Sequence, residues 1–323
     1  MRRFFALFVL LCYMIIPILG LSQTNNPKPT GNKKTTVIPV TLSPDSSSKN
    51  NGNVKTKNPQ QVVLKKPGDS IKMKAREYFM SAGKKAESKD YKGAIKDYRK
   101  SLSYNKSAIT YTKLAYAYLL SQEYDSAIVA SKEGMKMLPK NFEACTILGV
   151  AYYEKQNFDD AFNTFQKACG LNPTNPDPMV HNYMAAIKFL KKDYKSAVIY
   201  YDSVVMKDSS YQDVFTNRGM MQHYLGNFKD AINDYSTAIK IDSTDANACN
   251  NRAAARIVLK EFPLALEDLD HAIRLNPGYA NAYENRGKVK LQLGDKVGAC
   301  TDWTKSLSMG LETSKELIIR NCK

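Results

Sequence analysis

The chain is 323 residues long and carries 47 Lys and Arg against 31 Asp and Glu, which gives a formal net charge of +16 at pH 7. Half of that charge lies between Ser22 and Ala75, where ten Lys accompany two Asp, so the rest of the chain is only mildly basic. Because the body of the chain is not dominated by Lys and Arg, a nucleic acid is disfavoured as the main ligand.

Residues 1–22 have the three-part pattern of an export signal. Residues 1–3 are basic at Arg2 and Arg3, residues 4–20 are apolar, and the small residues Gly20 and Ser22 suit cleavage before Gln23. The apolar run 4–20 is at the lower limit of length for crossing a bilayer, so an uncleaved membrane anchor is the alternative. We therefore expect an exported protein that is periplasmic, envelope-associated or secreted.

Residues 23–71 are rich in Lys, Asn, Pro and Ser and poor in apolar side chains. Too little apolar surface is present to offset the entropy of ordering this segment, so the sequence predicts a disordered linker. Its Lys residues would also allow contact with an anionic envelope surface, such as lipid headgroups or acidic polymers. A solvating spacer is the simpler interpretation of the same composition.

One pattern recurs three times at a constant interval. Asn-Arg followed by Gly or Ala occurs at residues 217–219, 251–253 and 285–287, and each copy is followed at fixed spacing by an Ala and then an Asp. An aromatic-x-x-Ala motif, with Lys296 in place of the aromatic in the last copy, extends the period; its alanines are Ala94, Ala127, Ala161, Ala197, Ala231, Ala265 and Ala299. Such internal repeats, with apolar residues at helical spacing, indicate stacked copies of one helical structure.

These motifs resemble the tetratricopeptide repeat, most fully in the third copy. Its matching residues are Gly149, Tyr152, Phe158, Ala161, Phe165, Ala168 and Pro173. The resemblance implies an all-α, right-handed superhelical solenoid of antiparallel helix pairs, with seven repeats over residues 72–310. A capping helix at residues 311–323 would cover the last repeat; its apolar residues are Leu311, Leu317, Ile318 and Ile319.

In this family the first helix of each repeat lines a concave groove, which implies a site for a partner peptide or helix. Asn217, Asn251 and Asn285 would form a ladder of amides that donate to and accept from a peptide backbone. Solvation, or bonding to a neighbouring repeat, is the competing interpretation. The same helix face supplies the other predicted groove residues, which are Tyr116, Tyr183, Met220, Tyr224 and, at the edge, His223. Part of this stripe would equally suit packing between repeats.

Arg and Asp recur together only in the three C-terminal repeats. The sequence predicts structural ion pairs that bridge the two helices of a repeat, namely Arg218 with Asp234, Arg252 with Asp268, and Arg286 with Asp302. Exposed pairs of this kind contribute only about 0 to 1 kcal/mol each.

Five cysteines follow the predicted signal. Antiparallel packing of the last repeat helix and the capping helix would bring Cys300 and Cys322 together as a disulfide, with two buried free thiols as the alternative. Cys145 and Cys169 belong to one repeat and could also approach. No Cys-x-x-Cys pair occurs, and the three His have no second ligand at metal spacing, so we expect no metal, no cofactor and no enzymatic activity.

The sequence therefore predicts an exported protein–protein interaction scaffold that binds a partner peptide or helix in a concave groove. One alternative is a structural subunit of a cell-envelope assembly complex, for which the groove would be incidental. Another is an envelope-surface binder that acts through its basic N-terminal tail.

Overall fold

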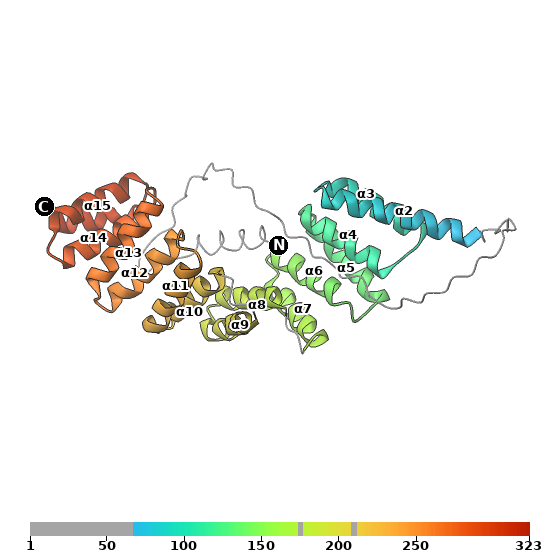
Figure 1. The fold of residues 1–323 in the computed structure, drawn as a ribbon, viewed down its shortest axis with the longest axis horizontal. Helices are drawn as coiled ribbons and strands as arrows, with labels where there is room; N and C mark the ends of the chain where they lie inside the picture. Colours follow the sequence, from blue (N-terminus) through green and yellow to red (C-terminus); the bar gives the residue numbers. More distant parts are fainter. Residues whose placement is uncertain (1–66, 174–176, 208–211) are drawn as a thin grey trace, which may run out of the picture. The chain divides into compact units, whose positions relative to one another are not determined.

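The computed structural model of the protein describes residues 67–173, 177–207 and 212–323 (Figure 1). The predicted signal and residues 23–66 of the predicted linker lie outside the described residues. The helices are α2 (Pro67–Glu87), α3 (Tyr91–Tyr104), α4 (Ala108–Leu120), α5 (Tyr124–Met137), α6 (Phe142–Glu154), α7 (Phe158–Leu171), α8 (Pro178–Leu190), α9 (Tyr194–Lys207), α10 (Gln212–Tyr224), α11 (Phe228–Ile241), α12 (Ala246–Val258), α13 (Phe262–Leu275), α14 (Ala280–Gln292), α15 (Lys296–Ser308) and α16 (Thr313–Asn321). The described ranges contain no strand, so the prediction of an all-α fold is confirmed. None of these helices combines the length and the hydrophobicity that crossing a bilayer requires.

The helix α2 begins at Pro67, a few residues before the predicted start of the repeats at residue 72. Proline suits the first position of a helix, because the backbone N–H that it lacks would have no partner within the helix there. The segment from Pro67 to residue 71 is therefore part of the first repeat helix.

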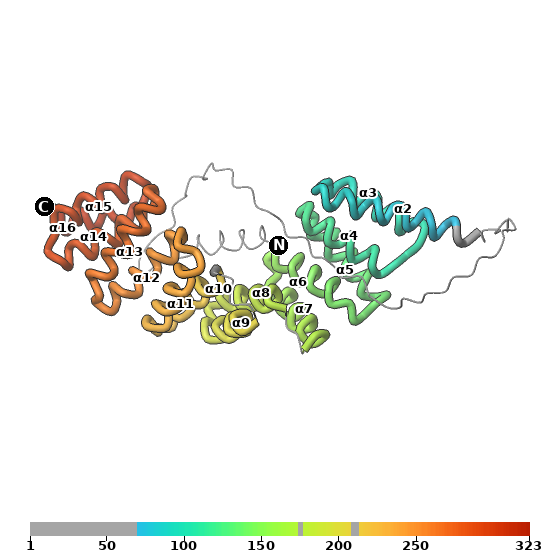
Figure 2. Tube along the Cα trace, in the orientation of Figure 1, coloured from blue at the N-terminus to red at the C-terminus, as the bar shows by residue number. Residues whose placement is uncertain are grey.

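The chain alternates helices with short turns, which Figure 2 follows from end to end of the described residues. Side-chain caps mark several helix starts: Asp90 accepts a hydrogen bond from the backbone N–H of Gly93 at 2.9 Å, and Asp295 accepts one from Gly298 at 2.8 Å. The turn that precedes the second helix has a residue with positive φ in all seven repeats. These turn residues are Lys89, Gln122, Gln156, Lys192, Gly226, Lys260 and Gly294.

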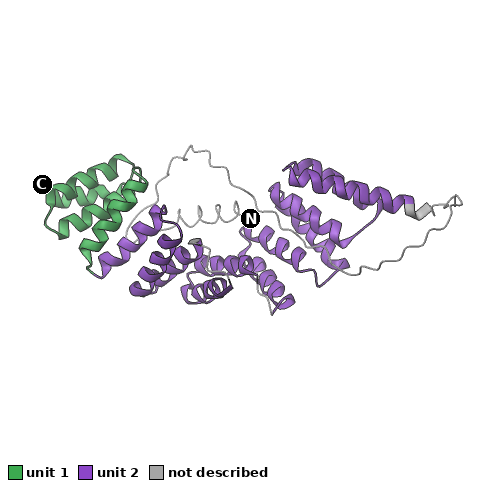
Figure 3. Ribbon diagram, in the orientation of Figure 1, with its two compact units in different colours: residues 1–63, 260–323 green, residues 64–259 purple. Residues whose placement is uncertain are grey.

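The described chain divides into two units (Figure 3). Unit 2, residues 64–259, contains α2 to α12, and its consecutive helices pack on one another. First helices of adjacent repeats also meet there, since α4 contacts α6 and α10 contacts α12. Unit 1 contains the described residues 260–323, where α13 packs on α14, α14 on α15, and α15 on α16.

Small residues pack against an aromatic ring in the core of the third repeat, as the spacing predicts. In the third repeat, Ala161 and Phe165 are fully buried, and a Cβ added at Gly149 would lie only 2.6 Å from the Phe165 ring. Adjacent repeats share this core, because Phe215 of α10 packs with Ala238 of α11 and Ala248 of α12. Each repeat thus buries its second apolar face on its neighbour.

The helix α16 covers the end of the last repeat, but not with all the predicted residues. Leu311 is buried, and Leu317 and Ile318 are half-buried. Ile319 is 56% exposed, so its predicted place in the packing face is wrong. The fully buried Ser314 takes part in a polar contact instead, because its hydroxyl donates to Glu284 Oε2 at 2.9 Å.

Candidate partner-binding surface

The first helices of the second and third repeats, α4 and α6, present exposed apolar and charged side chains together. Ile109 is 60% exposed and Tyr116 is 36% exposed, and their heptad spacing places both on one face of α4. Between them, Lys113 donates from Nζ to Glu143 Oε1 of α6 at 2.7 Å. We call Ile109, Lys113, Tyr116 and Glu143 the α4–α6 surface.

Tyrosines and carboxylates determine the electrostatics around this surface. Burial raises the pKa of Tyr116, and Tyr91 and Glu143 raise it further. Burial also raises the pKa of Glu154, at the end of α6. The pKa of Tyr124 is raised by burial and then by the nearby Glu154. The tyrosine hydroxyls therefore stay protonated at neutral pH and can donate hydrogen bonds, while Glu143 can accept them.

Two predicted groove residues, Tyr183 and Met220, are buried, with 5% and 7% exposure. The Tyr183 ring stacks on Phe165 with centroids 5.3 Å apart and meets the Tyr153 ring edge-on at 5.0 Å. The burial of both side chains is at odds with their prediction as groove residues, and the ring contacts of Tyr183 are those of packing between repeats.

The three predicted ladder asparagines differ in exposure. Asn217 and Asn285 are buried, at 6% and 8% exposed, and Asn251 is half-buried. Asn251 Oδ1 accepts a hydrogen bond from Asn250 Nδ2 at 3.4 Å. Within the described part of the chain, Asn217 Nδ2 is buried without a hydrogen-bond partner. This burial is at odds with a row of amides open to a peptide backbone.

Tyr224 and His223 lie at the end of α10, and both are half-buried. The Tyr224 ring stacks on Tyr194 with centroids 4.7 Å apart. His223 meets the Phe228 ring edge-on at 5.1 Å, and burial lowers the pKa of its imidazole. Tyr224 therefore packs on the fourth repeat and His223 at the turn of the fifth, and both leave only part of their surface for a partner.

Arg218 binds two carboxylates with one guanidinium. It donates to Asp234 from Nε at 3.0 Å and from Nη2 at 2.6 Å, and to Asp202 from Nη1 at 2.7 Å. Burial opposes its charge, but the two carboxylates outweigh this effect and raise the pKa of Arg218. Asp202 belongs to α9, so the guanidinium joins two adjacent repeats. Asp202 was not predicted as a partner, although it precedes Arg218 by the same spacing by which Asp234 follows it.

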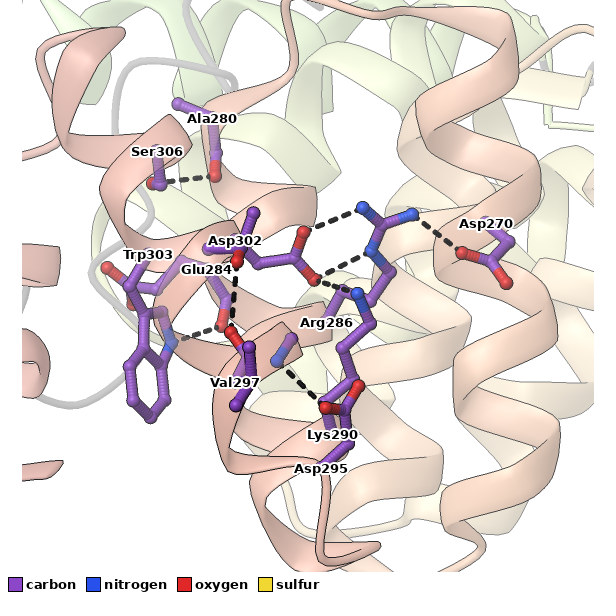
Figure 4. A network of polar contacts seen from close by, with 12 residues as sticks. Asp270, Ala280, Glu284, Arg286, Lys290, Asp295, Val297, Asp302, Trp303 and Ser306 are labelled. Carbon is purple, nitrogen blue, oxygen red and sulfur yellow. Dashed lines mark hydrogen bonds and ion pairs between the residues drawn. The ribbon is translucent and has the colours of Figure 1, made fainter. Parts of the chain in front are cut away.

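Arg286 has the same arrangement in unit 1 (Figure 4). Its Nε and Nη2 donate to Asp302 at 2.8 and 2.7 Å, and its Nη1 donates to Asp270 at 2.7 Å. The hydrogen bonds from Arg286 to Asp302 are the main reason why the pKa of the guanidinium is raised. Lys290 adds a second cation at 2.9 Å from Asp302, whose side chain is 4% exposed.

Arg252 occupies the equivalent position in α12. Its Nη1 donates to Ser236 Oγ at 3.1 Å, so Ser236 stands where the other two arginines have Asp202 and Asp270. The pair of Arg252 with Asp268, which belong to different units, stays a prediction.

Family models of the tetratricopeptide repeat match residues 142–175 and 213–245. This chain contains tetratricopeptide repeats. A segment of 94 residues is 29% identical to the human Superkiller complex protein 3, and it covers 29% of this chain but only 6% of that protein.

Solved structures share the tetratricopeptide-repeat fold. The C-terminal part of a repeat protein from Cytophaga hutchinsonii has a TM-score of 0.63 at 18% identity over 76% of this chain and 99% of that chain. A tetratricopeptide repeat protein from Parabacteroides merdae has a TM-score of 0.54 at 17% identity over 78% and 100%. YrrB, described as having an unusual peptide-binding site, has a TM-score of 0.53 at 21% identity over 57% and 95%. These likenesses confirm the predicted solenoid and carry no information on the partner.

A disulfide joins the last tetratricopeptide repeat to its capping segment. Cys300 in α15 is bonded to Cys322, with the Cα atoms 5.7 Å apart. Cys145, Cys169 and Cys249 are free thiols, so Cys145 and Cys169 are not joined by a second disulfide.

Proposed function

We propose that this protein is an exported, non-catalytic scaffold that binds a partner protein through the α4–α6 surface. Tetratricopeptide repeats typically bind protein or peptide partners. The observation that carries the proposal is the exposure of Ile109 and Tyr116 beside the Lys113–Glu143 pair. Met220, which occupies the position of Tyr116 in the fifth repeat, is buried. Apolar side chains left exposed next to charges are typical of a protein-binding surface.

The chemistry of the surface favours a partner segment with both apolar and basic side chains. Apolar residues of the partner would cover Ile109 and the ring of Tyr116. A Lys or Arg would reach Glu143, whose side chain is 52% exposed and is only partly engaged by Lys113. Desolvating that charge pair in the complex would add specificity more than affinity.

Export is supported by the pattern of residues 1–22 and by the Cys300–Cys322 disulfide. Disulfides persist in oxidising compartments and are rare in reducing ones. We therefore place the protein in the periplasm, on the envelope or outside the cell. Mass spectrometry of the protein recovered from cells tests this, because cleavage would leave Gln23 as the first residue, and an intact Met1 would indicate an anchor.

Affinity capture with a matched control tests the partner surface. The protein from Gln23 onward is immobilised in four forms: native, Ile109→Ala with Tyr116→Ala, Asn217/Asn251/Asn285→Ala, and Val129→Ala with Ile199→Ala. Val129 and Ile199 are 62% and 63% exposed on second helices, so the last form removes similar apolar area elsewhere. Circular dichroism establishes that all four are folded.

Proteins captured from envelope extract are identified by mass spectrometry, purified and titrated against each form. We expect a partner whose affinity falls at least about tenfold in the Ile109/Tyr116 variant and stays unchanged in the Val129/Ile199 control. Truncating two central anchors, at more than about 1 kcal/mol each, exceeds the roughly 1.4 kcal/mol of a tenfold change. A partner lost only in the asparagine variant would move the site to the amide positions. Equal binding by all four forms would refute a role for either surface.

A further inference from the structure

Two sulfur atoms and an imidazole nitrogen, all able to bind a metal, lie close together between α7 and α8, at the junction of the third and fourth repeats. Cys169 comes from α7, and His181 and Met184 come from α8. Cys169 Sγ lies 3.9 Å from His181 Nε2 and 3.9 Å from Met184 Sδ. His181 and Met184 are one helical turn apart, so both face α7 from one side of their helix.

These separations suit a trigonal metal centre. Two donors 3.9 Å apart, each about 2.1 to 2.3 Å from one ion as in protein zinc sites, subtend about 115 to 130° at that ion. An angle near 120° is that of three ligands around a three-coordinate cation. Cys169 Sγ therefore lies from each of the other two donors at the separation that a shared ion requires.

The exposure of the cluster would let a metal ion enter from solvent. Cys169 and His181 are half-buried, whereas Met184 is 3% exposed and forms the inner side of the cluster. The His181 ring stacks on Tyr200 of α9 with centroids 6.0 Å apart, which fixes its orientation. Its Nδ1 is buried and has no hydrogen-bond partner among the residues that the structure describes. Burial lowers the pKa of His181, so the imidazole is uncharged and can act as a ligand at neutral pH.

We propose that Cys169, His181 and Met184 form a binding site for Cu(I). Thiolate and thioether sulfur select Cu(I), and imidazole also suits copper. Binding breaks the S–H bond of Cys169, forms a sulfur–copper bond and releases one proton to solvent, while copper keeps its oxidation state. One thiolate neutralises the single charge of Cu(I), whereas Zn²⁺ would leave a net positive charge in a half-buried site.

Sequence motifs of His and Cys predict no metal site in this chain. The cluster between α7 and α8 does not follow such a motif, because its third ligand is the thioether of Met184. Within the described ranges, no group of three His, Cys, Asp or Glu is arranged to hold a metal ion. The spacing of Cys169 and His181 matches no metal-binding motif, and only the packing of α7 on α8 brings them together. This site is independent of the α4–α6 surface, and neither proposal depends on the other.

Anaerobic titration of the full chain with Cu(I), in competition with bathocuproine disulfonate, tests the proposal. Every form carries Cys12→Ser to remove the thiol of the predicted signal. Ascorbate replaces thiol reductants, so that the Cys300–Cys322 disulfide stays closed and adds no ligands. The variants are Cys169→Ser, His181→Asn and Met184→Leu, and the matched control is Cys145→Ser, which removes another free thiol of the same repeat.

We expect one Cu(I) per native chain and a loss of affinity on the order of a hundredfold or more in each ligand variant, since even outer-shell partners of a metal are worth about 10- to 100-fold. The Cys145→Ser control should bind like the native chain. X-ray absorption of the native complex should show two sulfurs and one nitrogen around copper, which tests the site even where a variant misfolds. Native affinity in Cys169→Ser, a different ligand set, or stronger binding of Zn²⁺ than of Cu(I) would overturn the proposal.

Discussion

Arg218 and Asp202 belong to successive repeats, and their side chains lie 2.7 Å apart, Nη1 to Oδ1. The same guanidinium holds Asp234 with two further hydrogen bonds. Arg218 is therefore shared by the second helices of the fourth and fifth repeats. It connects the two repeats through charge as well as through apolar packing.

We expect Arg218→Ala to destabilise the protein by about 3 kcal/mol, because removing one partner of a buried pair leaves an uncompensated charge. The side chain of Asp234 is only 9% exposed and would lose its bidentate partner. Urea unfolding followed by circular dichroism measures the change in free energy.

Asp202→Asn is the matched comparison. The Asp202 side chain is 47% exposed, so its loss should cost no more than about 1 kcal/mol. If the two variants were equally stable, the buried pair with Asp234 would not be the main contribution of Arg218.

The disulfide between Cys300 and Cys322 should stabilise the C-terminal end of the chain. Its two cysteines are 22 residues apart, and closing a loop of that length contributes about 3 kcal/mol in the chain-entropy picture. The Cys300→Ser, Cys322→Ser double variant should lose this amount in denaturant unfolding. A reductant should bring the native protein to the same stability and leave the double variant unchanged; a native protein insensitive to reductant would contradict the assignment.

Gly287→Ala should disturb the last repeat. A Cβ there would lie 2.5 Å from Nε1 of Trp303, a fully buried residue whose indole N–H donates to the Glu284 carbonyl at 3.1 Å. Overpacking of this kind costs about 1 to 3 kcal/mol. Since the chain has one Trp, its fluorescence reports the change directly.

Gly170→Ala provides the control for that prediction. Gly170 is also helical, but a Cβ added there meets no atom within 4 Å. Alanine at this position should leave stability unchanged or raise it by up to about 1 kcal/mol through helix propensity. A similar loss in both variants would show that the contact with Trp303 is not the cause.

Asp213 makes stability depend on pH. Burial, together with the nearby carboxylates of Asp245 and Asp242, raises the pKa of its carboxyl to about 6. An unfolded Asp ionises near about 3.9, so between about pH 4 and 6 the folded chain holds more protons than the unfolded chain. The contribution of Asp213 to stability therefore falls as pH rises through this window.

Asp213→Asn should remove that dependence. Allowing for partial solvent exposure, we expect the variant to be more stable than the native chain by about 1 to 2 kcal/mol near pH 8. Near pH 4 the two should unfold alike. Urea unfolding at both pH values checks this, and an equal difference at both would exclude ionisation of Asp213 as the cause.

Local spacing allowed much of the fold to be predicted. Gly149 and Phe165 belong to the two helices of one repeat, and their contact follows from the geometry of a helix pair. The exposure of the binding surface could not be predicted in this way. Tyr116 and Met220 occupy the same repeat position, yet one is 36% exposed and the other is buried, because coverage depends on the side chains of the adjacent first helices.

Contacts between repeats cannot be predicted from spacing for a related reason. Spacing within one repeat pairs each arginine with the Asp of its own repeat and does not indicate Asp202 or Asp270, which lie one repeat earlier. The Cys169–His181 contact likewise joins the second helix of one repeat to the first helix of the next. The repeat period identifies equivalent positions in each repeat, but it does not show which residues are in contact across the boundary between two repeats.

The left-handed turn residues offer a route to a more heat-resistant protein. Five of the seven turns hold Lys or Gln at positive φ, a conformation that disfavours any residue with a Cβ by about 1 to 2 kcal/mol. Glycine already occupies the other two, Gly226 and Gly294. Replacing the five by Gly would relieve that strain, partly offset by the greater freedom of Gly in the unfolded chain. Melting temperature could thus be raised by changes confined to the turns, with the four residues of the α4–α6 surface kept unchanged.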